Sequence, residues 1–255
     1  MKTTVITGAA SGIGAAVKKQ LEQQGHQVIS VDRQEADVVA DLSTEAGRKL
    51  AVEQVLAKAE RIDGLVCCAG VGVTAPRYDI ITEVNFFGAV ALIDGLKERL
   101  AQSDKPAVTV IGSFAASQQL AAPDALSLAL LEQDRERIAT LLETDTQGPH
   151  IAYSASKYAL TAYCRQQAVA FGKLGVRLNV IAPGAVSTPL HQASLEDPVF
   201  GSAVKNFVAP LGAHTEPEQI ANAVTFLQSE HAQFVHGSVL FVDGGMDAMI
   251  RPKSF

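Results

Sequence analysis

Seven short apolar runs rich in β-branched residues alternate with longer segments whose apolar residues recur at helical spacing. The runs are nearly continuous in apolar character, which is typical of strands covered on both faces of a sheet. We expect strands at residues 3–7, 27–32, 36–40, 64–69, 107–113, 176–182 and 238–243, and helices at 12–24, 44–59, 79–102, 152–172 and 216–229. The alternation predicts one α/β domain over residues 1–255, a doubly wound parallel sheet of about seven strands.

Residues 114–150 interrupt this alternation between the strand at 107–113 and the helix that carries Tyr153. The segment PDALSLALLEQDRERIATLLET has apolar residues at helical spacing, so we expect a helical insertion of one or two helices. A long structureless loop is uncommon inside a compact domain. The insertion leaves the carboxyl end of a strand, which is where open α/β sheets bind ligands.

The composition narrows the class of protein. A hydrophobic content of 47% and a charged content of 19% favour a sizeable core and argue against disorder. The net charge of −6 argues against nucleic acid as a main partner, because phosphate binding needs a basic surface. No run reaches the roughly 18 apolar residues of a membrane span, and the amino terminus lacks a signal-peptide h-region. We expect neither nucleic acid nor membrane among its partners.

The cysteines and histidines indicate neither a disulfide framework nor a metal site. Cys67, Cys68 and Cys164 are an odd count, which suits a reducing compartment and predicts a cytoplasmic location. Cys67 and Cys68 lie in an apolar run, so we interpret them as small buried hydrophobes, with a vicinal redox pair as the alternative. His231 and His236 lack an acidic partner at ligand spacing, so no metal is expected.

The segment TGAASGIG, from Thr7 to Gly14, lies between the first expected strand and the first expected helix. Its glycines permit a tight turn, close approach of backbone to a pyrophosphate, and close packing of helix on strand. Free N–H groups at the helix start would then face the phosphates. An ordinary glycine-rich turn is the alternative, but the strand–turn–helix context favours dinucleotide binding. The expected contacts are Gly8, Ser11, Gly12, Ile13 and Gly14.

Asp32 ends the second expected strand, eighteen positions after Gly14. A carboxylate there can accept hydrogen bonds from the adenosine ribose and would repel a 2′-phosphate, which favours NAD over NADP. Arg33 follows directly and could bind a phosphate. Asp41 and Leu42 are expected near the adenine edge, although Asp41 could equally be an N-cap.

The segment YSASK places Tyr153 four residues before Lys157, so helical geometry puts both side chains on one face. Such a pair is either a surface coincidence or a tuned proton donor. A free tyrosine has a pKa of about 10, too high for acid–base work at neutral pH. A positive charge about 4 Å away would lower that pKa by about three units at an effective dielectric constant of about 20.

Six motifs in order resemble the short-chain dehydrogenase/reductase family over the whole chain: TGAASGIG, CCAG (67–70), NFFG (85–88), IGS (111–113), YSASK (153–157) and APG (182–184). The resemblance implies a Rossmann-type fold and an NAD-dependent oxidoreductase. One departure is clear, because the family usually has asparagines where Cys67 and Cys68 stand. Gly70 still allows close approach to the coenzyme.

The resemblance also implies roles for single residues. Tyr153 would be the general acid or base, Lys157 would support it and hold the nicotinamide ribose, and Ser113 would hydrogen-bond the substrate oxygen. Asn85 would anchor a water relay to the lysine, and Thr188 would hold the nicotinamide carboxamide. Three of these residues also have a purely structural alternative: Ser113 as a turn serine, Asn85 as a helix residue bonding its own backbone, and Thr188 as an N-cap.

Residues 188–210 follow the segment expected to face the nicotinamide. Their apolar side chains Leu190, Leu195, Phe200, Phe207 and Val208 would form a substrate lid, or alternatively helix core. Further likeness, in the insertion and in the carboxyl-terminal segment 242–255, is to the hydroxysteroid dehydrogenases of the same family. It implies reversible conversion of a 3α-hydroxysteroid to the 3-ketosteroid, with reduction of other hydrophobic ketones and aldehydes.

Two other functions stay open from the sequence: a dehydrogenase for a non-steroidal hydrophobic alcohol, and a non-catalytic NAD-sensing protein. Extra helices beside the Tyr153 helix could block a surface through which many family members pair. We therefore expect a homodimer that uses a different face, such as the carboxyl-terminal region.

Overall fold

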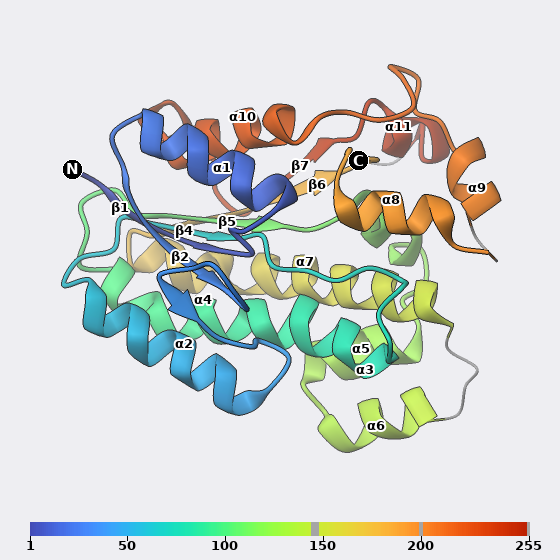
Figure 1. Cartoon of the computed structure of the whole chain (residues 1–255), viewed down its shortest axis with the longest axis horizontal. Helices are drawn as coiled ribbons and strands as arrows, with labels where there is room; N and C mark the ends of the chain where they lie inside the picture. Colours follow the sequence, from blue (N-terminus) through green and yellow to red (C-terminus); the bar gives the residue numbers. More distant parts are fainter. Residues whose placement is uncertain (144–147, 199–200, 254–255) are drawn as a thin grey trace.

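The computed structural model describes residues 1–143, 148–198 and 201–253 (Figure 1). Its centre is a seven-stranded sheet in the order β3-β2-β1-β4-β5-β6-β7, with every pairing parallel. The strands are β1 (Thr3–Thr7), β2 (Gln27–Asp32), β3 (Val38–Val39), β4 (Gly64–Cys67), β5 (Ala107–Ile111), β6 (Arg177–Pro183) and β7 (Val239–Val242). The expected doubly wound α/β domain is confirmed.

Helices cover both faces of the sheet, as Figure 1 shows. On one face lie α1 (Gly12–Gln23) and α10 (Pro217–Gln228), which pack against each other. On the other lie α2 (Glu45–Lys58), α4 (Ala89–Leu100) and α7 (Pro149–Lys173). Each face has its own apolar core, and the central strands β4 and β5 are fully buried between them. This explains why their sequences are continuously apolar.

The helix expected at 79–102 is present but is not α-helical throughout. It consists of α3 (Tyr78–Thr82), a π-helix over Glu83–Gly88 (η1), and then α4. A π-helical turn inserts an extra residue and rotates the side chains that follow, and such turns are frequent at functional sites. The strand expected at 36–40 is also shorter. Asp37 accepts hydrogen bonds from the Ser30 backbone N–H and hydroxyl, so a side chain replaces the sheet ladder there.

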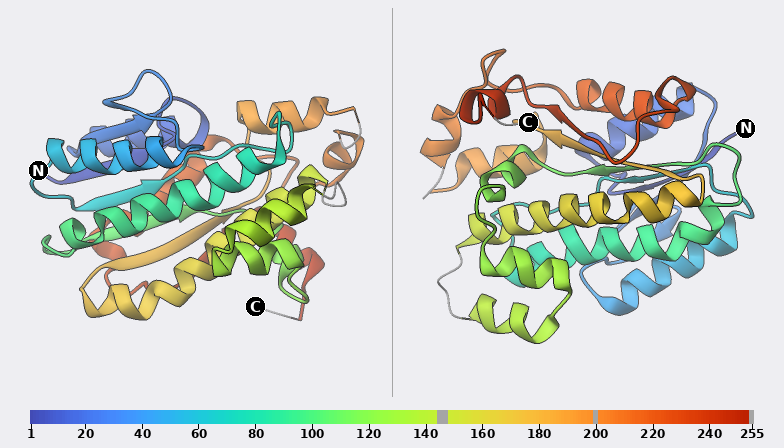
Figure 2. Two further views of the ribbon diagram at one scale, coloured as in Figure 1. Left: turned by 90° about the horizontal axis from the view of Figure 1, so that it is seen from below. Right: turned by 180° about the vertical axis from the view of Figure 1, so that it is seen from behind.

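The insertion is helical, as expected. It begins with a 3-10 helix over Phe114–Gln119 (η2) and continues with α5 (Ala125–Glu132) and α6 (Arg135–Glu143). Asp124 caps α5, because its carboxylate accepts the Ser127 N–H at 2.7 Å. Figure 2 shows α5 beside the amino-terminal half of α7, against which it packs. The insertion therefore covers part of the outer surface of α7.

Three of the remaining elements, α8 (Pro189–Glu196), α9 (Gly201–Asn206) and α11 (Met246–Ile250), lie around the carboxyl edge of the sheet. The 3-10 helix over Glu230–Ala232 (η3) lies at the opposite edge, where Arg177 at the start of β6 donates to the Ala232 carbonyl oxygen. The chain order reverses between β1 and β4, which places a crevice beyond the carboxyl ends of these strands. Within the described part of the chain, no helix combines the length and apolar character needed to cross a membrane.

Candidate active site

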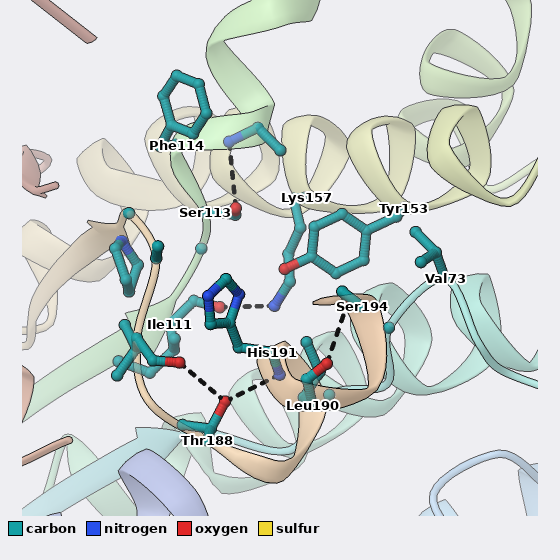
Figure 3. A pocket seen from close by; sticks show the side chains of 18 of the residues that line it. Val73, Ile111, Ser113, Phe114, Tyr153, Lys157, Thr188, Leu190, His191 and Ser194 are labelled. Carbon is teal, nitrogen blue, oxygen red and sulfur yellow. Dashed lines mark hydrogen bonds between the residues drawn. The ribbon is translucent and has the colours of Figure 1, made fainter. Parts of the chain in front are cut away.

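Tyr153 and Lys157 lie one turn apart on α7, and their polar atoms point into the same cavity (Figure 3). The Lys157 Nζ donates a 2.9 Å hydrogen bond to the Ile111 carbonyl oxygen at the end of β5. Ser113 follows two residues later and lines the same cavity. Lys157 is buried, with 5% of its surface exposed. The structure thus brings together the three residues that the motifs single out.

The pKa of the phenol is not set as the spacing suggested. Burial raises the pKa of Tyr153 above its ordinary value, and the hydrogen bond with Ser113 only partly opposes this. Lys157 Nζ lies 6.0 Å from the centroid of the Tyr153 ring, and burial lowers the pKa of the lysine to about 8. The expectation that Lys157 brings the phenol near neutrality is not met, because desolvation of the buried phenol raises its pKa and the charge of Lys157 does not offset this.

Ser113 is also the N-cap of the 3-10 helix that opens the insertion. Its Oγ accepts the Ala115 N–H at 3.1 Å, so the turn role foreseen as an alternative is real. That bond uses one acceptor site of the hydroxyl and leaves its proton available. The cap holds the hydroxyl at the cavity wall, where the catalytic role requires it.

Asn85 lies on the π-helix, is completely buried, and binds a neighbouring loop. Its amide accepts the Val71 N–H at 2.8 Å and donates to the Val71 carbonyl at 3.0 Å and to Ser156 Oγ at 3.2 Å. The alternative in which Asn85 bonds its own helix backbone is wrong. The amide instead ties the segment after β4 to α7; the water relay stays a prediction.

The glycine loop has the geometry of a phosphate cradle. Gly8 and Gly12 have φ angles of 69° and 53°, which favour glycine. A Cβ on Gly14 would lie 2.0 Å from the Gly8 carbonyl oxygen, so helix and loop pack as closely as a dinucleotide fold requires. The Ser11 side chain makes no capping hydrogen bond within residues 1–143, so the first-turn N–H groups of α1 can meet an anion.

A cavity of about 320 Å³ extends from this loop along the ends of β2 and β4. It is lined by the expected contacts Gly8, Ser11, Gly12, Ile13, Gly14, Asp32, Asp41, Leu42, Gly70 and Thr188. A Cβ on Gly70 would lie 3.3 Å from Asn85 Oδ1 and 3.6 Å from Lys157 Nζ, so only glycine leaves this wall open. The residues present fit a dinucleotide.

Asp32 and Asp41 line the same end of this cavity. The Asp32 carboxylate accepts the Ala10 N–H at 2.9 Å and the Arg33 N–H at 2.7 Å, so it also orders the glycine loop. Asp41 accepts the Ser43 N–H at 2.9 Å, whereas the N-cap of α2 is Thr44. The N-cap alternative for Asp41 is therefore wrong, and its place at the cavity wall fits the expected adenine edge.

Thr188 caps α8 and closes the coenzyme cavity at its other end. Its Oγ1 accepts the His191 N–H and donates to the Val186 carbonyl, both at 3.2 Å. Its methyl group would lie 3.2 Å from a Cβ on Gly12. The N-cap role is real, and the side chain also reaches the glycine loop. Leu190, the second residue of α8, lines both cavities.

A second cavity of about 490 Å³ opens beside Tyr153, and its lining is mainly apolar. Phe207 stacks on Phe114 with ring centroids 5.5 Å apart, so the segment 201–210 covers part of it. Phe200 lies outside the described residues, and Leu195 is absent from the lining described. The sequence did not single out His150, His191 or Ser194, which add polar groups to this wall (Figure 3). Their spacing matches no motif; His191 and Ser194 follow Thr188 on α8, and His150 lies one turn before Tyr153 on α7.

The cysteines at the end of β4 do not form a reactive pair. Burial raises the pKa of Cys67 to about 12 and raises that of Cys68 as well, so both stay protonated and weakly nucleophilic. Thr7 supplies a polar brace here, because its Oγ1 accepts the Ala69 N–H at 3.1 Å. Across residues 1–143, 148–198 and 201–253 there is no cluster of three potential metal ligands.

Comparison with known proteins identifies the family. Residues 2–125 match the family described as short chain dehydrogenase, and residues 138–247 match that described as Enoyl-(Acyl carrier protein) reductase. The 3-alpha-hydroxysteroid dehydrogenase/carbonyl reductase of Comamonas testosteroni is 44% identical over the full length of both chains. The chain belongs to the short-chain dehydrogenase/reductase family.

Other members of this family show the range of the likeness. The structure of the 3-alpha-hydroxysteroid dehydrogenase from Pseudomonas sp. B-0831, complexed with NADH, superposes with a TM-score of 0.96 at 51% identity and full coverage of both chains. The cis-4-hydroxycyclohexanecarboxylate dehydrogenase of Sinomonas cyclohexanicum is 29% identical over 97% of each chain. All of these proteins are named as dehydrogenases.

Proposed function

We propose that the protein is an NAD(H)-dependent oxidoreductase that reversibly interconverts a 3α-hydroxysteroid and the 3-ketosteroid, and that it also reduces other hydrophobic ketones and aldehydes. The observation that carries this proposal is the placement of Tyr153, Lys157 and Ser113 in one cavity, which shares Gly70, Thr188 and Leu190 with the adjoining dinucleotide cavity. One cavity fits a dinucleotide, and the other is apolar and large enough for a rigid hydrophobic alcohol. The full-length likeness to two hydroxysteroid dehydrogenases supports the substrate class.

In this mechanism the phenol of Tyr153 exchanges a proton with the substrate oxygen while Ser113 hydrogen-bonds that oxygen and fixes its position. NAD, when bound, would supply the hydride acceptor or donor for the carbinol carbon. In ketone reduction Tyr153 donates its phenolic proton to the substrate oxygen; alcohol oxidation is the reverse, in which the phenolate form of Tyr153 takes the proton from the alcohol. Lys157 holds a positive charge beside the phenol and is expected to bind the nicotinamide ribose.

The coenzyme is expected to be NAD rather than NADP. Asp32 accepts two backbone N–H groups at the ribose end of the cavity, which fixes its carboxylate where it would repel a 2′-phosphate. Gly8, Gly12 and Thr188 would hold the pyrophosphate and the carboxamide end.

The test is to incubate the purified protein and NAD with matched 3α- and 3β-hydroxysteroids and to follow NADH by absorbance. Turnover of the 3α epimer, with little or none of the 3β epimer, is the expected result. Strong turnover of small alicyclic alcohols and none of any steroid would replace the steroid by a non-steroidal alcohol. The relative that acts on cis-4-hydroxycyclohexanecarboxylate makes that the second candidate.

We also propose a homodimer built on the edge of the sheet formed by β7, in the cytoplasm. Exposed apolar side chains flank this strand: Phe234 is fully exposed, Val169 on α7 is 70% exposed, and Phe226 on α10 is 43% exposed. The insertion packs on the amino-terminal half of α7 and reduces the surface available there. All three cysteines are free thiols, which suits the reducing cytoplasm.

The dimer is tested by sedimentation equilibrium of the wild type and of Phe234→Glu. We expect the wild type at twice the chain mass and the variant shifted toward the monomer, because a buried charge opposes association. A monomeric wild type, or a tetramer, contradicts the proposed assembly.

A further inference from the structure

The carboxylate of Glu83 joins three parts of the chain that are far apart in the sequence. Glu83 is the first residue of the π-helix. Arg48 of α2 contacts it through Nη1, 2.7 Å from Oε2, and Arg135, the first residue of α6, pairs with Oε1. The insertion, α2 and the π-helix therefore meet at one acidic side chain.

Arg48 connects this cluster to the dinucleotide cavity. Its Nη1 also donates to the Leu42 carbonyl oxygen at 3.0 Å, and its side chain is only 8% exposed. Leu42 and the adjacent Ser43 line the cavity, and so does Val84, the residue after Glu83. Glu83 is therefore connected to this cavity wall in two ways: through Arg48, which binds the Leu42 carbonyl, and through its own backbone, which leads to Val84.

Arg135 supplies the outer half of the cluster. Its guanidinium lies over the Phe87 ring, 3.2 Å from the centroid, and Phe87 itself is buried. Stacking on a buried ring and pairing with a carboxylate together fix a planar guanidinium in one orientation. Arg135 thereby holds Glu83 in the position from which it binds Arg48.

The two arginines differ in what their loss would cost. Removing Glu83 would leave the buried guanidinium of Arg48 without its carboxylate, which is strongly destabilising. Removing Arg48 would also take away the hydrogen bond to the Leu42 carbonyl oxygen. Removing Arg135, whose side chain is 48% exposed, leaves a neutral Arg48–Glu83 pair. Arg135 can thus be changed while the fold persists.

We propose that Arg135 is a positioning residue for the coenzyme. It fixes Glu83, Glu83 fixes Arg48, and Arg48 holds the Leu42 carbonyl at the wall of the dinucleotide cavity. The insertion thereby contributes to coenzyme affinity without contacting the coenzyme. This inference rests on the proposed function, because it takes NAD(H) to be the occupant of that cavity.

The experiment measures the Kd for NADH by fluorescence titration, which needs no steroid. Arg135→Ala should raise this Kd by about 3- to 10-fold, as expected for a residue that acts through others. The kcat at saturating NAD should stay unchanged, because Tyr153, Lys157 and Ser113 keep their places. Arg135→Lys should fall between the two, since lysine keeps the charge but not the planar fork.

Arg137→Ala is the matched control. Arg137 lies on the same helix, its side chain is 43% exposed, and its Nη1 is 3.1 Å from Glu132 Oε2. The Arg137→Ala variant removes one positive charge from α6, as Arg135→Ala does, but Arg137 does not contact Glu83 in the described ion pairs. Its Kd for NADH should equal that of the wild type, and melting temperatures should show that all the variants are folded.

An unchanged Kd in Arg135→Ala would overturn the inference. An equal rise of the Kd in Arg135→Ala and Arg137→Ala would also overturn it, because it would indicate general attraction of an anionic ligand. A fall in kcat with no change in Kd would do the same. The proposed function fails differently: the wild type would not bind NADH, which refutes both, or would bind it without oxidising any 3α-hydroxysteroid, which leaves the Arg135 result to stand on the binding data.

Discussion

The ammonium of Lys157 donates to the carbonyl oxygen of Ile111, two residues before Ser113. This bond ties the face of α7 that carries Tyr153 and Lys157 to the end of β5, so the strand and the helix that supply the proposed reacting groups are held together. It also explains how a buried ammonium is tolerated, because the hydrogen bond to the carbonyl replaces part of the hydration that the ammonium loses on burial.

Lys157→Met should reduce turnover by roughly 100-fold or more, the usual scale for losing a group that supports acid–base catalysis. Methionine fills similar space but removes both the charge and the bond to Ile111. Steady-state kinetics of the variant test this, with Lys173→Met at the exposed end of the same helix as the control. A Lys157 variant that keeps most of its activity would show that the ammonium has no part in the chemistry.

Ketone reduction should decline as the pH rises through about 8. Burial lowers the pKa of Lys157 to about 8, so its positive charge is present below that pH and lost above it. Burial raises the pKa of Tyr153, so the phenol stays protonated over the same range and cannot cause the decline. The measurement is kcat/KM for a ketone with NADH from pH 6 to pH 10, corrected for enzyme stability. A flat profile over that interval would contradict the assignment.

Tyr153→Phe should bind NADH as the wild type does and lose roughly 100- to 10,000-fold in kcat, because the ring is kept and only the hydroxyl group that carries the proton is removed. NADH titration and initial rates measure the two effects separately. The same pair of measurements distinguishes an enzyme from an NAD sensor, since a sensor would need no phenolic proton. Unaltered turnover in this variant would remove the residue from the mechanism.

Local patterns predicted the elements whose boundaries are local. The expected strands at 3–7 and 27–32 coincide with β1 and β2, because β-branched runs bounded by glycine or charged residues end where pairing ends. Local patterns did not determine the N-cap of α2, because Asp41 and Thr44 are both of residue types that cap helices. Only the fold shows that Thr44 accepts the Gly47 N–H.

The residues that the sequence did not predict depend on contacts between distant segments. Glu83 and Arg135 are 52 positions apart, so no periodicity connects them. The π-helix at Glu83–Gly88 likewise has no signature in apolar spacing, although it places Asn85 against Val71. The pKa of Tyr153 was misjudged because the YSASK motif gives the spacing to Lys157 but does not show that the phenol is buried.

Gly14→Ala should weaken NADH binding at least about tenfold, because small displacements of a binding loop have large effects. The new Cβ would lie 2.0 Å from the Gly8 carbonyl oxygen, so the loop has to move. Overpacking of this kind should also lower the free energy of unfolding by about 1–3 kcal/mol. Gly148→Ala is the control, since a Cβ there meets nothing within 4 Å. Equal NADH affinity in the two variants would show that the cradle tolerates displacement.

Phe207→Ala should raise the KM for a steroid about 3- to 10-fold while the KM for NAD stays constant. The Phe207 ring stacks on Phe114 at the wall of the apolar cavity, and such aromatic pairs contribute about 0.5–1.5 kcal/mol beyond the area they bury. Truncation would therefore loosen the segment 201–210 against η2 and also remove apolar contact with the substrate. The coenzyme cavity does not include Phe207 in its lining, so coenzyme binding should not change.

Leu211→Ala is the matched control for this prediction, because Leu211 follows the same segment but its side chain is 90% exposed. Its steroid KM should match that of the wild type. A short alicyclic alcohol gives a second comparison: it reaches Tyr153 without needing the Phe207 wall, so its KM should change less than that of the steroid in Phe207→Ala. If the steroid KM is unchanged, or if the KM rises equally for the steroid and for the short alcohol, the segment 201–210 does not act as a lid that recognises the length of the substrate.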